Sequence, residues 1–253
     1  MTSKSLKRWQ DLCQVAAHRG VQLLLGFSTP LVDPRHWDGL WVNHPATGAG
    51  IALSSALNLQ SAIWVLAHEL GHEFTCDPSL PAAKAHITNE ENQKRWGQGR
   101  VRERDEEQAN LWAAQELITP DEWRQVEKMF PASLQDMARF LELPVAAALW
   151  RARAEQQQRP AGLVGTVSLD TKAQVMLSKP IKGEGGHQNL LRRIQLGQKG
   201  KVLRLQREDF DRMREYLVKT RGGYCARYRA IMECALEAIH AAGGPLAFFR
   251  PSR

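Results

Sequence analysis

The sequence contains no run of about 18 apolar residues, so we expect no membrane-spanning helix. Its first residues, MTSKSLKRWQDL, lack the apolar core of a secretory signal peptide. The cysteines include no CxxC pair, which argues against a disulfide framework and favours a reducing compartment; they are Cys13, Cys76, Cys225 and Cys234. Together these absences predict a cytoplasmic protein without a membrane partner.

The charge of the chain is unevenly distributed along its 253 residues. Residues 1–155 carry 16 Lys and Arg against 19 Asp and Glu, whereas residues 156–253 carry 18 against 8, a net charge of +10. The segment QQQRPAG at 156–162 has the composition of a linker. We therefore expect a domain at 1–155 and a smaller basic domain at 163–253, with different partners.

Hydrophobic periodicity divides the front part into short strands and longer helices. Short apolar runs bounded by Gly, Pro, Asp or Asn predict strands at 21–26, 39–43 and 50–54. Helical patterns are predicted over 5–18, from Asn58 to Asp77-Pro78, over 103–118, over 121–129 and in a proline-punctuated stretch at 132–153. The polar segment 78–101 is predicted to be a surface loop. The pattern indicates an α+β fold in which a small sheet packs with helices.

The motif HELGH, residues 68–72, lies within the longest helical pattern. On a helix, His68 and His72 are one turn apart and face the same way, so the two imidazoles can bind one Zn²⁺ ion. Glu69 lies beside the first ligand, where it can take a proton from an attacking water and return it to a leaving amine. The alternative is a core helix that happens to carry two histidines, but burying them and Glu69 unpaired would be costly. Gly71 costs about 1 kcal/mol of helix propensity, so we expect another backbone to approach closely there.

A catalytic zinc site needs a third protein ligand and one open position. The helical pattern at 103–118 offers Glu103, Glu106 and Glu107. Glu103 and Glu106 share one face of this helix, whereas Glu107 is rotated by about 100°. Glu106 lies at the edge of the apolar stripe, so the periodicity favours it without excluding the other two.

Two separated motifs resemble those of the ImmA/IrrE-type metallopeptidases, a gluzincin-like family. Its members carry AHELGH on one helix, then a second helix reading E-x-x-A-x-x-F/W-A before a Leu-Ile-Pro-like stop. The matching residues here are Ala67-His68-Glu69-Leu70-Gly71-His72, then Glu106, Ala109, Trp112 and Ala113, then Leu117-Ile118 and Pro120. Segment 133–153 also resembles the small helical segment that follows the site, so the resemblance covers about residues 20–155. One departure is Thr119, which stands as an extra residue before the proline.

This resemblance implies a site and a function. It implies zinc ligands His68, His72 and Glu106, with Glu69 as the general base, on a small mixed β-sheet packed with helices. It implies a zinc endopeptidase that cleaves a specific protein, commonly a helix-turn-helix transcriptional repressor, in a stress or prophage regulatory switch. The alternatives are a non-catalytic zinc-containing regulator and a toxin–antitoxin component, which would bind a repressor or DNA through the basic domain.

The basic part of the chain contains two similar segments: GGHQNLLRRI at 185–194 aligns without gaps with GGYCARYRAI at 222–231. This predicts a small α/β domain with a duplicated βα or loop–helix unit. Four arginines follow these Gly-Gly pairs, near expected helix N-termini where anions are favoured: Arg192, Arg193, Arg227 and Arg229. They predict contact with nucleic acid or an acidic protein partner, the alternative being a solvated face around a docking or dimerisation domain.

Overall fold

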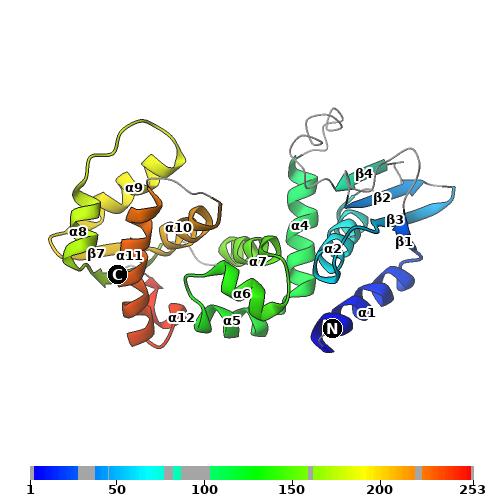
Figure 1. Cartoon of the computed structure of the whole chain (residues 1–253), viewed down its shortest axis with the longest axis horizontal. Coiled ribbons are helices and arrows are strands. Elements are labelled where there is room, and N and C mark those ends of the chain that lie inside the picture. Colours follow the sequence, from blue (N-terminus) through cyan, green and yellow to red (C-terminus); the bar gives the residue numbers. More distant parts are fainter. Residues whose placement is uncertain are drawn as a thin grey trace. The chain divides into compact units, whose positions relative to one another are not determined.

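The computed structural model describes residues 3–27, 38–44, 46–76, 82–86, 103–158, 162–219 and 224–251. It is of the α+β class, with many helices and two four-stranded sheets (Figure 1). No helix in these ranges is long and apolar enough to cross a membrane.

By its internal contacts the chain divides into two compact units. The first comprises Met1–Pro120 and Ala138–Ala154, and the second comprises Asp121–Met137 and Glu155–Arg253. Residues 121–137, which the sequence analysis placed in a domain at 1–155, therefore group with the second unit. The ranges 1–155 and 163–253 remain a prediction about which parts fold independently.

The first unit holds a mixed sheet with strand order β1-β3-β2-β4, in which β1 runs parallel to β3 and the other pairs are antiparallel. Its elements are α1 (Ser3–His18), β1 (Gln22–Phe27), β2 (Gly39–His44), β3 (Gly48–Ser54), α2 (Leu59–Thr75), β4 (Ala82–His86), α4 (Glu103–Leu117) and most of α7 (Val145–Gln158). Helix α6 (Leu134–Leu141) spans the change of unit at 137.

Most elements of the first unit follow the sequence pattern, and β4 is the exception. The sequence analysis predicted a loop over 78–101, which is wrong for 82–86 because these residues pair with β2. The strand sequence AAKAH contains no β-branched or aromatic residue, so its side chains gave no signal for a strand. Its backbone hydrogen bonds to β2 define it instead.

Helix α2 is capped at its N-terminus and buried along its central part. The side chain of Asn58 caps the N-terminus by accepting a hydrogen bond from the Ser61 amide at 2.9 Å. The helix ends at Thr75, before the predicted stop at Asp77-Pro78. Residues 63–72 are all buried, because the sheet, α1 and α4 surround this stretch. The HELGH motif therefore lies in the interior of the first unit.

The C-terminal end of α4 is fixed by two buried arginines of the first unit. Arg8 Nε donates to the Leu117 carbonyl at 3.1 Å, and Arg151 Nε donates to the Ile118 carbonyl at 2.9 Å. A helix leaves its last carbonyls without helical partners, and cations are favoured at that end. These contacts hold α4 in a defined position beside α2.

The second unit holds an antiparallel sheet with strand order β6-β7-β5-β8. Its further elements are α5 (Pro120–Met129), β5 (Leu163–Ser168), α8 (Thr171–Ser178), α9 (Gly186–Leu196), β6 (Gln198–Lys199), β7 (Val202–Gln206), α10 (Arg207–Lys219), α11 (Cys225–Ala241), α12 (Pro245–Phe248) and β8 (Arg250–Pro251). The sequence analysis predicted an α/β domain here, but the antiparallel pairing makes it α+β.

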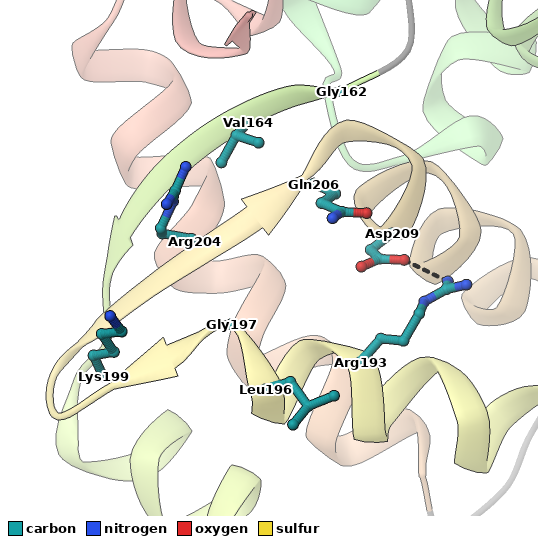
Figure 2. Close-up of a pocket in the computed structure, with 9 residues that line it drawn as sticks. All are labelled: Gly162, Val164, Arg193, Leu196, Gly197, Lys199, Arg204, Gln206 and Asp209. Atoms are coloured by element: carbon teal, nitrogen blue, oxygen red, sulfur yellow. Dashed lines mark hydrogen bonds and ion pairs between the residues drawn. The ribbon is translucent and has the colours of Figure 1, made fainter. Parts of the chain in front are cut away.

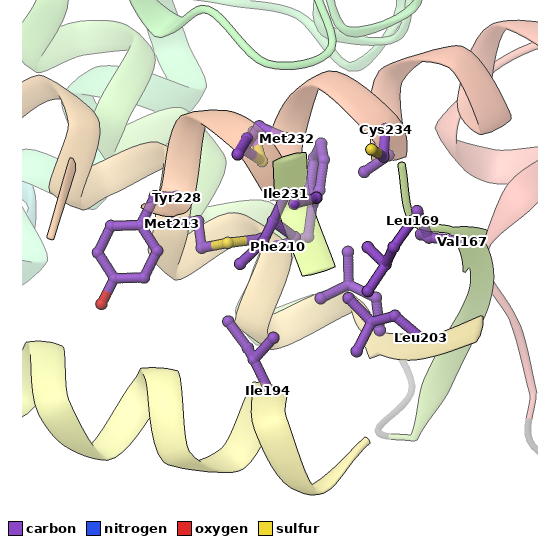
Figure 3. Close-up of a cluster of buried hydrophobic side chains, with 14 of the residues drawn as sticks. Val167, Leu169, Ile194, Leu203, Phe210, Met213, Tyr228, Ile231, Met232 and Cys234 are labelled. Carbon is purple, nitrogen blue, oxygen red and sulfur yellow. The ribbon is translucent and has the colours of Figure 1, made fainter. Parts of the chain in front are cut away.

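One face of this sheet contributes to a continuous apolar core (Figure 3). Leu203 and Leu205 of β7 point into the core, where they join Phe210, Tyr228 and Ile231 from the helices. The alternate residues of β7 are exposed on the other face. The first Gly-Gly pair stands at the start of α9, with Gly185 as its N-cap and Gly186 as its first residue. The second pair, 222–223, lies outside the described residues. In the order of elements, α9 follows α8 and α11 follows α10, so both match the loop–helix alternative of the predicted unit and not the βα alternative. The duplication itself stays a prediction.

A buried ionic network joins α5 to α10 within the second unit. Glu127 accepts hydrogen bonds from Arg207 and, at 3.4 Å, from Arg214. Asp211 accepts from Arg207 at 2.9 Å and from Arg214 at 3.1 Å. All four side chains are at most 4% exposed, and the two carboxylates balance the two guanidiniums.

Candidate metal centre

Helices α2 and α4 run side by side in the first unit (Figure 1). Their backbones approach each other closely at Gly71. A Cβ atom placed on Gly71 would lie 2.6 Å from the Ala109 carbonyl oxygen and 2.8 Å from its Cα. Any other residue would therefore force the two helices apart. The close approach predicted from Gly71 is confirmed, and α4 is the element that makes it.

This contact brings together three potential metal ligands: His68, His72 and Glu106. The two histidine Nε2 atoms are 3.1 Å apart. Glu106 Oε2 lies 3.2 Å from His68 Nε2, and Glu106 Oε1 lies 3.3 Å from His72 Nε2. Both imidazoles are almost completely buried. Helices α2 and α4 thus bring the donor atoms of three side chains close together.

The spacing of these donors fits a metal ion. In a tetrahedral zinc site with bonds of about 2.0–2.1 Å, neighbouring ligand atoms are about 3.3–3.4 Å apart. The observed separations of 3.1–3.3 Å are close to this value. Two imidazoles and one carboxylate are also a donor set that zinc accepts. This group could therefore bind a metal.

Glu106 is the donor that reaches the surface, since 35% of its side chain is exposed. Burial raises the pKa of its carboxyl, but hydrogen bonds and charge interactions with His68 and His72 outweigh burial and hold the pKa well below its usual value. The carboxylate is consequently ionised at neutral pH and available as a ligand. Glu107 is exposed and is absent from the group, and the side chain of Glu103 lies outside the described residues.

Asn110 orients the first histidine. Its Nδ2 donates to the Glu106 carbonyl at 2.7 Å, which turns its Oδ1 toward His68 Nδ1 at 3.0 Å. Because an amide oxygen only accepts, His68 Nδ1 is the donor in this contact. This leaves Nε2 as the ring nitrogen that faces Glu106 and His72, where it could bind a metal in place of a proton. The sequence analysis did not identify Asn110, although its position one turn after Glu106 could have indicated a supporting role.

We predict that Asn110→Ala lowers zinc affinity by about 10–100-fold, the usual effect of losing the partner that orients a ligating histidine. Competition with a chromophoric zinc chelator would measure the change. The matched control is Gln108→Ala, which alters an exposed residue of the same helix and should bind zinc like the wild type. An Asn110→Ala protein with unchanged affinity would show that His68 does not need this contact.

Glu69 is completely buried on α2 between the two histidines. Its carboxylate packs against Gly39 at the start of β2, where a Cβ atom would lie 2.7 Å from Glu69 Oε1 and 2.5 Å from Val65 Cγ1. Gly39 therefore provides the space for this carboxylate. Like Asn110, it supports the site and was not identified by the sequence analysis. Trp41, two residues along β2, lies with its ring 6.0 Å from that of His72 and donates to Glu73 at 3.0 Å.

The arginines of α9 lie elsewhere on that helix than the sequence predicted. Arg192 and Arg193 occupy its C-terminal half, away from the N-terminal amides that favour anions. Arg192 donates to the Gly183 carbonyl at 2.7 Å, and Arg193 pairs with Asp209 of α10. The expectation of an anion site at the N-terminus of α9 is therefore wrong for these two residues.

The arginines of α11 lie near its start, as predicted. Arg227 donates to the carbonyls of Lys179 and Pro180 at 2.9 and 3.0 Å, which ties α11 to the loop between α8 and α9. Arg229 is exposed. The contacts of Arg227 are thus structural, and anion binding by Arg229 stays a prediction.

Comparison with known proteins leaves the family open. No protein-family model matches the chain, and no curated protein does. One similar solved structure is a Mycobacterium tuberculosis transcriptional regulator, with 15% sequence identity and a TM-score of 0.38. The match covers 67% of this chain and 48% of that one, so this chain spans about half the length of that protein. Similarity at this level does not indicate a shared function.

Proposed function

We propose that this chain is a zinc-dependent endopeptidase. The supporting observation is a group of three protein donors, His68, His72 and Glu106, that is buried on the histidine side and reaches solvent at Glu106. Structural zinc sites are usually closed by four protein ligands, whereas catalytic sites have three and leave one position open. Among the described residues, the group contains three side chains.

The chain's own residues supply the acid–base chemistry. Zinc, when bound, would polarise a peptide carbonyl and make a nearby water more acidic. His68, His72 and Glu106 would hold the ion, with Asn110 fixing the tautomer of His68. Glu69 would take one proton from the water as its oxygen attacks the carbonyl carbon. The same carboxyl would then return that proton to the amide nitrogen as the C–N bond breaks.

The substrate follows from the resemblance to ImmA/IrrE-type metallopeptidases. On this basis we propose that the chain is a member of that family. We also propose that it cleaves a specific protein, a helix-turn-helix transcriptional repressor, in a stress or mobile-element switch. The two motifs that carry the resemblance, at 67–72 and 106–113, both contribute side chains to the donor group, which supports this proposal.

We predict that Glu69→Gln keeps zinc and loses cleavage. Glutamine has the same shape but does not accept the proton, so the rate should fall by about 10²–10⁴-fold. The assay incubates zinc-loaded protein with a bacterial proteome-derived peptide library and a panel of purified helix-turn-helix repressors, and detects new termini by mass spectrometry. Zinc affinity is measured in parallel.

Two results would contradict this mechanism. Cleavage by Glu69→Gln at the wild-type rate would exclude Glu69 as the general base. Zinc-loaded wild type that cuts neither the library nor any repressor would contradict the peptidase and favour a non-catalytic regulator.

A further inference from the structure

The second unit has a basic concavity that the proposed peptidase chemistry does not use. A cavity of about 510 Å³ lies between the end of α9, the outer face of β5 and β7, and α10 (Figure 2). We call it the hairpin groove, because one wall is the β6–β7 hairpin. The groove residues that matter here are Arg193, Leu196, Gly197, Lys199, Arg204 and Asp209.

The charge of the groove is positive. Arg193, Lys199 and Arg204 line it and are exposed, whereas Asp209 is the one acidic residue among its described lining residues. Asp209 is nearly buried and paired with Arg193, so it balances that one guanidinium. Lys201, exposed in the hairpin turn next to Lys199, adds further positive charge at the rim. This excess of cations favours an anionic occupant.

The β6–β7 hairpin adds lysines at the rim of the groove. The walls of the groove include the helix α9 and a ribbon of two paired strands, β6 and β7. The turn of the ribbon carries Lys199 and Lys201 on either side of Gly200, where they can reach phosphates.

The lining disfavours other anionic partners. Among the residues that the structure describes, no aromatic side chain lines the groove, so unpaired bases find no platform for stacking there. Tryptophan and tyrosine, the usual anchors of protein–protein contacts, are likewise absent from its lining in the described part of the chain. We propose that the hairpin groove binds the sugar-phosphate backbone of duplex DNA, chiefly through Lys199, Lys201 and Arg204.

Fluorescence anisotropy of the full chain with a labelled mixed-sequence duplex tests this proposal. Three phosphate contacts predict that log K falls with log salt concentration with a slope of about −3. Lys199→Ala/Lys201→Ala should weaken binding by about tenfold or more and bring the slope closer to zero by about 2. The matched control, Lys179→Ala/Lys182→Ala, removes two exposed lysines of the same unit that do not line the groove and should change neither quantity by as much.

Three results would overturn the proposal. The first is duplex binding that is absent or independent of salt. The second is an equal or larger loss of binding in the control variant. The third is a poly-glutamate peptide that competes as well as duplex DNA of equal charge, which would identify an acidic protein as the partner. Since the groove and the metal ligands belong to different units, DNA binding should survive Glu106→Ala, so this test does not depend on the peptidase.

Discussion

Replacing Glu106 with alanine is expected to lower zinc affinity by more than about 100-fold while leaving the fold intact. Glu106 is the only carboxylate in the donor group, and its two oxygens lie 3.2 and 3.3 Å from the two histidine nitrogens. Losing a direct ligand should exceed the 10–100-fold effect typical of a supporting partner. The fold should survive, since the side chain is partly exposed and alanine favours a helix.

Glu107→Ala is the matched control for this substitution. It removes the same group from the next residue of α4, where the side chain is exposed and outside the donor group. Isothermal titration with zinc, together with circular dichroism to monitor folding, compares the three proteins. Equal losses of affinity in both variants, or no loss in Glu106→Ala, would remove Glu106 from the metal site.

The second large effect is expected at Glu127, in the buried network of the second unit. Glu127→Gln keeps the shape of the side chain but leaves Arg207 and Arg214 with Asp211 as their one remaining carboxylate in the network. Breaking a buried pair in this way costs about 3–5 kcal/mol, because an uncompensated charge stays away from water. We therefore expect a large destabilisation of the second unit.

Hydrogen exchange by mass spectrometry measures this loss where it occurs. Amides of α10 should exchange about 100-fold faster or more in Glu127→Gln, since about 3 kcal/mol corresponds to that factor. The control is Glu233→Gln, which breaks the exposed ion pair with Lys172 and should leave the exchange of α10 unchanged. Unchanged exchange in Glu127→Gln would show that the network does not stabilise this unit.

The two histidines of the candidate metal centre could be predicted because their placement depends on local helical periodicity. His68 and His72 share a face of any helix through that segment, and Gly71 indicated the close approach of a second backbone. The choice of Glu106 over Glu103 and Glu107 depended on the family resemblance, because helical periodicity favoured Glu106 without excluding the other two. The structure groups Glu106 with the histidines as the resemblance implied, and zinc as the bound metal stays a proposal.

Contacts between distant segments could not be predicted in the same way. Gly39 makes room for Glu69 across 30 positions of sequence, and no local pattern indicates such a pairing. The grouping of 121–137 with the second unit depends on Glu127 finding Arg207 and Arg214, about 80 residues away. The hairpin groove likewise arises from side chains of several elements, whereas the sequence analysis looked for anion contacts within single helices.

The metal content of the purified chain tests the central claim most directly. Protein saturated with zinc, freed of excess ion by gel filtration and measured by mass spectrometry of the element, should contain one zinc per chain. A chain that retains no zinc after this treatment would contradict the metal centre. His68, His72 and Glu106 would then be only a hydrogen-bonded group in the core of the first unit.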